Sequence, residues 1–206
     1  MESPQIENPK FQIEKEELIT MYEEDFSYIL KDAHLRHELK EQPDALKEAR
    51  ALWWNEYVES RKSNVAKLKE IIAEIGWPTI SKVGEEACFS AFMIIQHADF
   101  DLDFQKQGLE MMEQARNDIH LFGMAALTDR VAMNSGKDQT YGTQLKRDED
   151  GAVVPLVPIK DPENVEKRRA EMGLMPFEIY KSRFGGNLSP ENESYVEKIG
   201  RFQKVF

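Results

Sequence analysis

The stretch GWPTISKVGEEACFSAFMIIQHADFDLD, residues 76–103, decides the fold of this chain. It begins with a GWP turn, whose first residue, Gly76, suits the left-handed end of a preceding helix. From about Ser81 to Asp99 the residues are apolar on most sides at helical spacing. A helix that is apolar nearly all round is usually buried at the centre of its domain. The sequence therefore predicts one central helix around which the other elements pack.

Three polar side chains interrupt this apolar helix along a single line. At about 100° per residue, Glu86, Ser90 and His97 fall within roughly 40° of one another. Burying such groups without partners costs roughly a few kcal/mol each, so they need hydrogen bonds. Two interpretations stay open: a polar network inside the helical core, or one wall of a ligand pocket.

Composition excludes some classes of partner. The 206 residues, 41% of them hydrophobic, suffice for the core of one domain or of one domain with an appendage. A net charge of -11 argues against non-specific binding to nucleic acid or to an anionic membrane. No run approaches the roughly 18 apolar residues of a membrane helix, and Met1–Lys10 resembles neither a signal peptide nor an anchor. We therefore expect a cytoplasmic protein with no nucleic-acid and no membrane partner.

Hydrophobic periodicity predicts a mainly α fold, a helical bundle-like domain with one small β-hairpin at about residues 139–157. The hairpin signal is Asp150-Gly151 between two β-prone arms. Helices are predicted over about 14–39, 44–75 with a break near Lys62, 81–99, 104–117, 121–133, 162–172 and 176–184. The predicted organisation is a disordered tail at 1–10, a single helical domain with the hairpin at 11–184, and an accessory helix at 185–206.

Several familiar chemistries lack their sequence motifs in this chain. There is no P-loop, no dinucleotide-binding glycine fingerprint, no HExxH zinc motif and no GxSxG nucleophile elbow. Zinc needs His or Cys ligands, of which the chain has few. Magnesium or manganese could bind His97, Asp99, Asp101 or Asp129, but the spacing of these residues is not specific for a metal. We expect no cofactor and assign no metal site.

Five stretches in a fixed order carry a resemblance to a known family. They read GWPTISKVGEEA, QHAD, LTDRV, GKDQTYGTQ and PIKDPENVEKRRAEMGLMPFEIY. With them the chain resembles an uncharacterised bacterial family, a domain of unknown function, whose members carry GWP, G-E-x-A, QHAD, L-x-DR, Q-x-YG-[ST]-Q, P-x-x-D and RR-x-x-x-G-L. The resemblance covers about Gly76 to Tyr180 and implies motif positions but no reaction. Asp25-Phe26 departs from an acidic-glutamine pair that members often carry, so no role is assigned to Asp25.

The motif residues are more polar than packing alone requires. Histidine can pass protons near neutral pH, and a carboxylate can orient it. The candidate catalytic residues are therefore His97, Glu86 and Asp129. Amide, hydroxyl, carboxylate and guanidinium groups can hold a substrate through directional hydrogen bonds. The candidate substrate-binding residues are Gln96, Asp99, Arg130, Gln139, Tyr141, Thr143 and Gln144.

Two arrangements of these residues are compatible with the sequence. In the first, the hairpin folds over the central helix and closes a small polar pocket. In the second, Asp129 and Arg130 pair with Arg168 or Arg169, and the hairpin is a structural clasp. The first arrangement favours catalysis, and the second favours a structural role for the motif.

Two classes of function follow from these arrangements. The first is a small metal-independent hydrolase or lyase that uses a His/carboxylate pocket on a small polar substrate. The alternative is a non-catalytic ligand- or protein-binding module of the interaction or immunity type, whose partner is a small molecule, a peptide or a protein. A divalent-metal phosphohydrolase is a narrower third option. It predicts that manganese or magnesium shifts the melting temperature, and that Asp99→Ala abolishes this shift.

Overall fold

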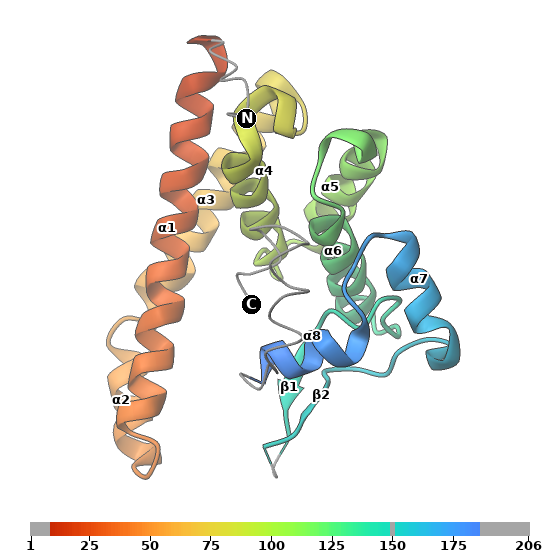
Figure 1. Cartoon of the computed structure of the whole chain (residues 1–206). Helices are drawn as coiled ribbons and strands as arrows, with labels where there is room; N and C mark the ends of the chain where they lie inside the picture. The colour runs from red at the N-terminus through yellow and green to blue at the C-terminus, as the bar shows by residue number, and fades with distance from the viewer. Residues whose placement is uncertain (1–8, 149–150, 186–206) are drawn as a thin grey trace, which may run out of the picture. The chain divides into compact units, whose positions relative to one another are not determined.

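A computed structural model of the chain describes residues 9–148 and 151–185 (Figure 1). These residues form eight α-helices, two short 3-10 helices and one antiparallel sheet of two strands, which confirms the predicted mainly α fold with a small hairpin. Within these two ranges, no helix combines the length and the apolar character that crossing a membrane requires. The chain divides into two compact units, one up to Phe100 and one from Asp101, and each is described by itself. The single domain predicted over 11–184 stays a prediction.

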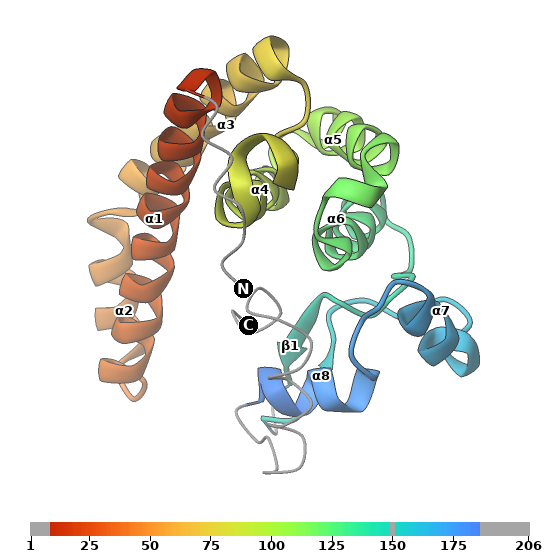
Figure 2. The ribbon, with the colours of Figure 1, turned by 45° about the horizontal axis from the view of Figure 1, so that its top comes forward.

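Four helices build the first unit. They are α1 (Pro9–Glu38), α2 (Pro43–Ala51), α3 (Trp54–Ile75) and α4 (Ile80–Gln96). Helix α1 packs along α4, α3 contacts both of them, and α2 folds back beside the second half of α1 (Figures 1 and 2). Helix α1 begins inside the tail predicted at 1–10, and the rest of that tail lies outside the described residues.

Helix α4 is the core of this unit, as the sequence predicts. Its buried side chains run from Val83 to Gln96 on nearly every side, and Leu18 of α1 and Leu68 of α3, the two helices that contact α4, are fully buried as well. The helix is interrupted at Gly84, whose φ of 84° lies in the left-handed region that favours glycine. The last regular turns of α4 therefore hold His97 at a fixed place, directly after Gln96.

The predicted break near Lys62 is wrong. Lys62 lies exposed inside the continuous helix α3, and the chain instead turns at Leu52 and Trp53, between α2 and α3. This turn leaves Leu52 exposed but buries Trp53, which stacks on Tyr28 of α1 with ring centroids 5.9 Å apart. Burial of a large aromatic ring decides the position of the break, because it stabilises more than a few extra helical residues would.

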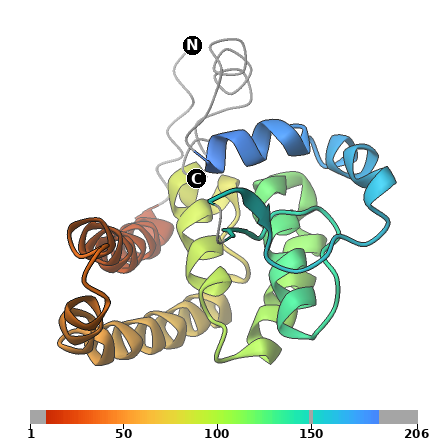
Figure 3. The same ribbon diagram turned by 90° about the horizontal axis from the view of Figure 1, so that it is seen from below.

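The second unit combines helices with the hairpin. Its elements are α5 (Leu102–Gln114), η1 (Arg116–Asp118), α6 (Leu121–Asn134), β1 (Leu145–Arg147), β2 (Val153–Pro155), η2 (Pro162–Asn164), α7 (Val165–Glu171) and α8 (Phe177–Phe184). Helices α5 and α6 lie alongside each other (Figure 3). The strands pair with Lys146 opposite Val154, so the hairpin is shorter than the predicted span of 139–157. The accessory helix predicted at 185–206 lies outside the described residues, apart from Gly185.

Candidate functional site

A histidine, an aspartate and an arginine meet on three helices of the first unit, and we call them the His–Asp–Arg cluster. The Nδ1 atom of His97 lies 2.5 Å from Oδ2 of Asp25. The Nε atom of Arg61 lies 2.8 Å from Oδ1 of the same carboxylate. Asp25 is 3% exposed, whereas the side chains of His97 and Arg61 are 16% and 22% exposed. A buried carboxylate thus holds two side chains that both reach solvent.

Regular helical spacing places each member of the cluster. Asp25 follows Leu18 and Met21 of α1 by seven and four residues, so it occupies a core-facing position of that helix. Arg61 follows Tyr57 of α3 by four residues, and its guanidinium lies over the Tyr57 ring, 4.2 Å from the centroid. His97 is the C-terminal cap of α4, so α1, α3 and α4 each supply one member of the cluster.

The charges of the cluster decide which nitrogen of His97 carries a proton. Burial alone would raise the pKa of Asp25, but the hydrogen bond and charge of His97 and the charge of Arg61 outweigh it and hold this pKa below its ordinary value. Asp25 is therefore ionised at neutral pH and can only accept hydrogen bonds. It follows that Nδ1 of His97 donates to Asp25, which leaves Nε2 available as a proton acceptor when the ring is neutral.

Two tyrosines, Tyr22 of α1 and Tyr57 of α3, lie close enough to Asp25 for its charge to shift their pKa values. Burial raises the pKa of Tyr22 to about 12, and the Asp25 charge adds to this effect. Burial likewise raises the pKa of Tyr57 to about 12, where Arg61 opposes the shift and Asp25 supports it. The Tyr22 ring meets the Phe89 ring edge to face, with centroids 5.8 Å apart. Both phenols thus stay protonated at neutral pH, and the apolar surroundings strengthen the electrostatics of the cluster.

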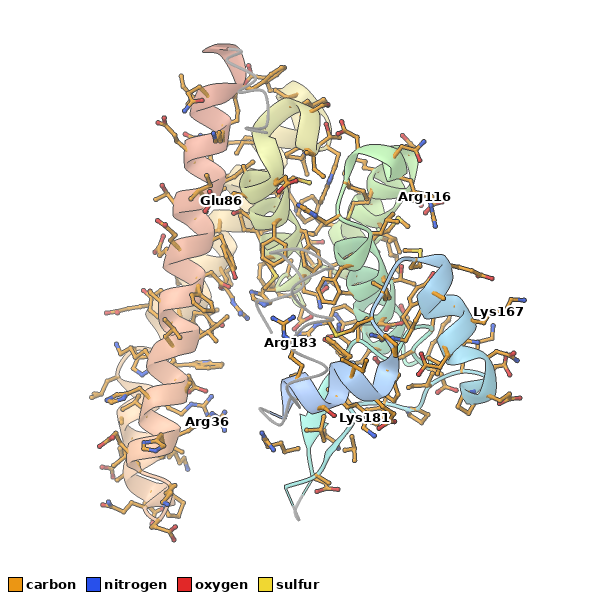
Figure 4. All side chains as sticks on the ribbon, in the orientation of Figure 1. Arg36, Glu86, Arg116, Lys167, Lys181 and Arg183 are labelled. Carbon is orange, nitrogen blue, oxygen red and sulfur yellow. The ribbon has the colours of Figure 1, made fainter. Side chains whose placement is uncertain are left out.

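The predicted polar line on α4 is only partly realised. Glu86 is exposed (labelled in Figure 4), and it is its backbone oxygen that accepts the Ser90 hydroxyl, at 2.9 Å. Gln96 is buried beside His97, and Asp99 is exposed and raises the pKa of Tyr57. The carboxylate that meets His97 therefore belongs to α1 and not to Glu86.

The second unit contains another buried carboxylate, that of Asp129 on α6, which is 0% exposed. Its Oδ1 accepts the backbone N–H groups of Thr140 and Tyr141 at 2.6 and 3.0 Å. Its Oδ2 accepts the backbone N–H and the hydroxyl of Thr143, both at 2.8 Å. Burial raises the pKa of Asp129, and these donors oppose that rise. Four donors leave no acceptor for a carboxyl proton, so the carboxylate is the form that fits this loop.

Two glutamines close the same loop, residues 139–144, which we call the Asp129 loop. Gln139 is buried, accepts the Gln144 backbone N–H at 2.7 Å, and donates to the carbonyls of Gln144 and Val157. The Gln144 side chain donates to the Ala126 carbonyl of α6 and accepts from Arg130, each at 3.2 Å. The amides of Gln139 and Gln144 are thus used within the fold of the second unit.

Arginines bind the carbonyl groups of the Asp129 loop. Arg168 donates to the Thr140 carbonyl at 2.8 Å, and Arg169 donates to the Tyr141 carbonyl at 2.6 Å. Arg169 is 1% exposed, and burial lowers its pKa. The clasp therefore forms differently from the predicted pairing, since Arg168 and Arg169 bind backbone oxygens and the Asp129 carboxylate binds backbone N–H groups.

The described residues also include a surface groove on the first unit, with a volume of about 510 Å³. It lies between α2 and the first turn of α3, and Pro43, Leu46, Lys47, Arg50, Ala51, Trp54 and Asn55 line it. The Arg50 guanidinium lies 5.1 Å from the centre of the Trp54 ring, and that tryptophan is 42% exposed. The groove thus joins an aromatic wall to two cationic side chains. Across residues 9–148 and 151–185, no group of three or more His, Cys, Asp or Glu side chains has a metal-binding arrangement.

Sequence reasoning singles out His97 but misses its partners. Asp25 carries a signal, because a carboxylate on the apolar face of an amphipathic helix needs a buried partner. Arg61 carries a weaker one, since it follows Tyr57 and precedes Val65 at the same four-residue spacing. What the sequence does not supply is the pairing of α1 with α4, which joins residues 72 positions apart.

Fold and cluster together define a mainly α-helical protein in which a buried carboxylate orients a histidine at a helix end. The chain belongs to the family of unknown function DUF6624, whose model matches residues 56–186, well over half of the 206 residues. Arg61 and His97 lie inside the matched range, and Asp25 lies before it. No curated protein and no solved structure matches the chain significantly.

Proposed function

We propose that this protein is a small metal-independent enzyme, a hydrolase or lyase, in which His97 transfers a proton to or from a small polar substrate. His97 acts through Nε2 as general base or general acid. Asp25 holds the ring in the tautomer with the proton on Nδ1 and stabilises the imidazolium that forms after proton uptake. Arg61 holds Asp25 in place and keeps it ionised.

This proposal rests on one observation: the two ring nitrogens of His97 have different environments. Nδ1 is bound to a buried carboxylate, and the ring keeps 16% of its side-chain surface in solvent. Among the described residues, no hydrogen bond to Nε2 is present. A purely structural histidine would use both nitrogens inside the core, because an unpaired buried nitrogen costs about 1–3 kcal/mol. A histidine with one oriented and one accessible nitrogen suits proton transfer.

The proposed chemistry assigns no step to Glu86 or Asp129. Glu86 is exposed, and Asp25 occupies the position beside His97 that a partner carboxylate would take. Both oxygens of Asp129 are occupied by loop donors, so we propose that Asp129 shapes the second unit and does not react. Gln96 and Asp99, the neighbours of His97 in sequence, remain candidates for substrate contacts.

The test is a screen of chromogenic esters, phosphate esters and glycosides with the wild-type protein and with His97→Gln. We expect turnover of at least one substrate class, a loss of about 10²-fold or more in His97→Gln, and no change in His37→Gln, which alters an exposed histidine of α1. Glutamine keeps a hydrogen-bonding side chain but cannot transfer the proton. Absence of turnover across the panel, or equal turnover in His97→Gln, contradicts the proposal.

A second candidate function is a non-catalytic binding module, and the groove between α2 and α3 favours it. Trp54 gives the groove an apolar surface, and Lys47 and Arg50 add positive charge to a chain of net charge -11. The partner that fits is a peptide with an apolar side chain beside carboxylates. Fluorescence titration with acidic aromatic peptides tests this. Binding that Lys47→Glu weakens and Lys62→Glu does not supports the module, and equal loss in both variants contradicts it.

A further inference from the structure

We propose that Arg61 is the substrate-recognition residue of the His–Asp–Arg cluster, and that the substrate carries an oxyanion, a carboxylate or a phosphate. This inference rests on the proposed function, because it assigns the chemical class of the substrate that His97 meets. It extends the role of Arg61 beyond holding Asp25.

Arg61 uses only a small part of its hydrogen-bonding capacity within the protein. Its Nε donates to Asp25 at 2.8 Å, and its guanidinium carbon lies over the Tyr57 ring, 4.2 Å from the ring centroid. In the described part of the chain, no hydrogen bond from its two Nη groups is present, and neither Nη is a buried polar atom without a partner. With 22% of the side chain exposed, the Nη groups therefore face solvent.

The cation–π contact with Tyr57 and the bond to Asp25 hold the guanidinium in place before any ligand binds. A fixed guanidinium presents N–H donors in one plane, which matches the two oxygens of a carboxylate or phosphate. Ordering an arginine during binding costs side-chain entropy, but Arg61 is already ordered by its contacts within the fold. Arg61 is thus a preorganised half of an anion site.

The same carboxylate brings Arg61 and His97 together. Asp25 holds Arg61 through Oδ1 and His97 through Oδ2, so both partly exposed side chains emerge beside one buried aspartate. A substrate oxyanion on the Nη groups would therefore lie near the ring that carries Nε2. The chain's net charge of -11 disfavours polyanions, so we expect a ligand with few negative charges.

Arg168 and Arg36 have different hydrogen-bonding partners and exposure from Arg61. Arg168 donates to the carbonyls of Thr140, Lys160 and Asp161, and so uses most of its donors inside the fold. Arg36 pairs with Asp32 on the surface of α1, with 57% of its side chain exposed (labelled in Figure 4). Arg61 differs from both, because it is immobilised and still has donors to offer.

The experiment is a titration of the full chain with inorganic phosphate and with acetate, followed by NMR chemical shifts of the Arg61 and His97 side chains. Chloride at matched ionic strength is the control for screening. We expect saturable binding of phosphate, acetate or both. The anion that binds more tightly indicates whether the substrate carries a phosphate or a carboxylate.

Variants separate recognition from folding and from catalysis. Arg61→Gln should weaken binding about tenfold or more, Arg61→Lys should weaken it less because it keeps the charge, and Arg36→Gln should leave it unchanged. If Arg61→Gln fails to fold, Arg61→Lys provides the test, because lysine keeps the charge but lacks the planar set of N–H donors that should bind the anion. His97→Gln should still bind the anion while losing turnover, so recognition can stand when catalysis fails.

Three outcomes of the anion titrations would overturn the assignment. They are no saturable binding of either anion to the wild-type protein, equal weakening in Arg61→Gln and Arg36→Gln, and an identical response to chloride. Turnover of a neutral substrate that Arg61→Gln leaves unchanged would overturn it as well, while leaving the role of His97 intact.

Discussion

Among residues 9–148 and 151–185, each unit buries one aspartate, and the two aspartates have different kinds of partner. Asp129 accepts four hydrogen bonds, and three of its donors are backbone N–H groups of one loop. Asp25 accepts from two side chains that arrive from other helices and reach solvent. Backbone donors cannot turn away, so Asp129 fixes a shape. Side chains that still have donors or acceptors to offer can bind a ligand, so we propose that Asp25 supports a functional site.

The comparison shows that a buried carboxylate is not by itself a sign of function. Burial and polarity are shared by Asp129 and Asp25. What differs is whether the partners have hydrogen-bonding capacity left, which only the contacts reveal. We therefore propose a functional role for Asp25 and a structural role for Asp129.

The largest effect is expected for Asp129→Asn. The amide nitrogen would meet a backbone N–H of the Asp129 loop, so a buried donor would lose its acceptor. We expect a loss of about 3 kcal/mol in the free energy of unfolding. Urea denaturation measures it as a lower midpoint with an unchanged slope. The control is Asp138→Asn, an exposed aspartate just before the loop, which should change stability by less than about 0.5 kcal/mol.

Gly142→Ala should follow, with a loss of about 2–3 kcal/mol. Gly142 has φ +68°, and an added Cβ would lie 2.7 Å from Cδ1 of Ile159 and 2.8 Å from Cε2 of Phe177. Gly136→Ala is the matched control, since Gly136 has φ +69° with no atom within 4 Å of its Cβ position. The control should lose only about 1 kcal/mol. Equal losses in both variants would show that the loop is not tightly packed, contrary to our description.

Much of the fold could be predicted from the sequence, because its signals are local. The end of α3 at Gly76 follows from a single residue with a known terminal preference, whereas α5 begins at Leu102, two residues before the predicted start at 104. The break near Lys62 could not be placed correctly, because burial of Trp53 against Tyr28 depends on a helix that precedes it in the chain. Local patterns specify helices, and distant packing shifts their ends.

The site was predictable only in part. His97 stands out because it ends an apolar helix, but its partner is 72 residues away on α1. Asp129 stands out equally, yet its role depends on the direction of the N–H groups of Thr140 and Thr143. Backbone direction follows from the conformation of the loop, including the positive φ of Gly142. Residue types alone reveal neither the distant partner of His97 nor the direction of the N–H groups around Asp129.

Asp25→Asn should cost less stability than Asp129→Asn, about 1 kcal/mol, because His97 and Arg61 can turn toward water when their acceptor changes. Denaturation of both variants in parallel measures the difference. Asp32→Asn is the control on the same helix, since Asp32 also pairs with two arginines, Arg36 and Arg50. A loss for Asp25→Asn as large as that for Asp129→Asn would contradict the division between the two aspartates.

The smallest effect is the pH dependence of this Asp25 contribution. The pKa of Asp25 is lowered in the folded state, so the unfolded state binds its proton more readily. The contribution is therefore fully present above the unfolded pKa, about 3.9, and is lost as pH falls through the folded pKa. As pH falls below about 4 and Asp25 takes up its proton, the gap in unfolding free energy between wild type and Asp25→Asn should close. A gap that stays open or widens below about pH 4 would contradict the ionised state of Asp25.

The tautomer of His97 tests most directly whether Asp25 orients the ring and leaves Nε2 available. It can be read from long-range proton–nitrogen NMR correlation of the neutral ring in wild type, Asp25→Asn and Glu86→Gln. We expect the tautomer with the proton on Nδ1 in wild type and in Glu86→Gln, and a loss of this preference in Asp25→Asn. A wild-type ring protonated on Nε2, or a preference that Glu86→Gln abolishes and Asp25→Asn retains, would contradict the proposed role of Asp25.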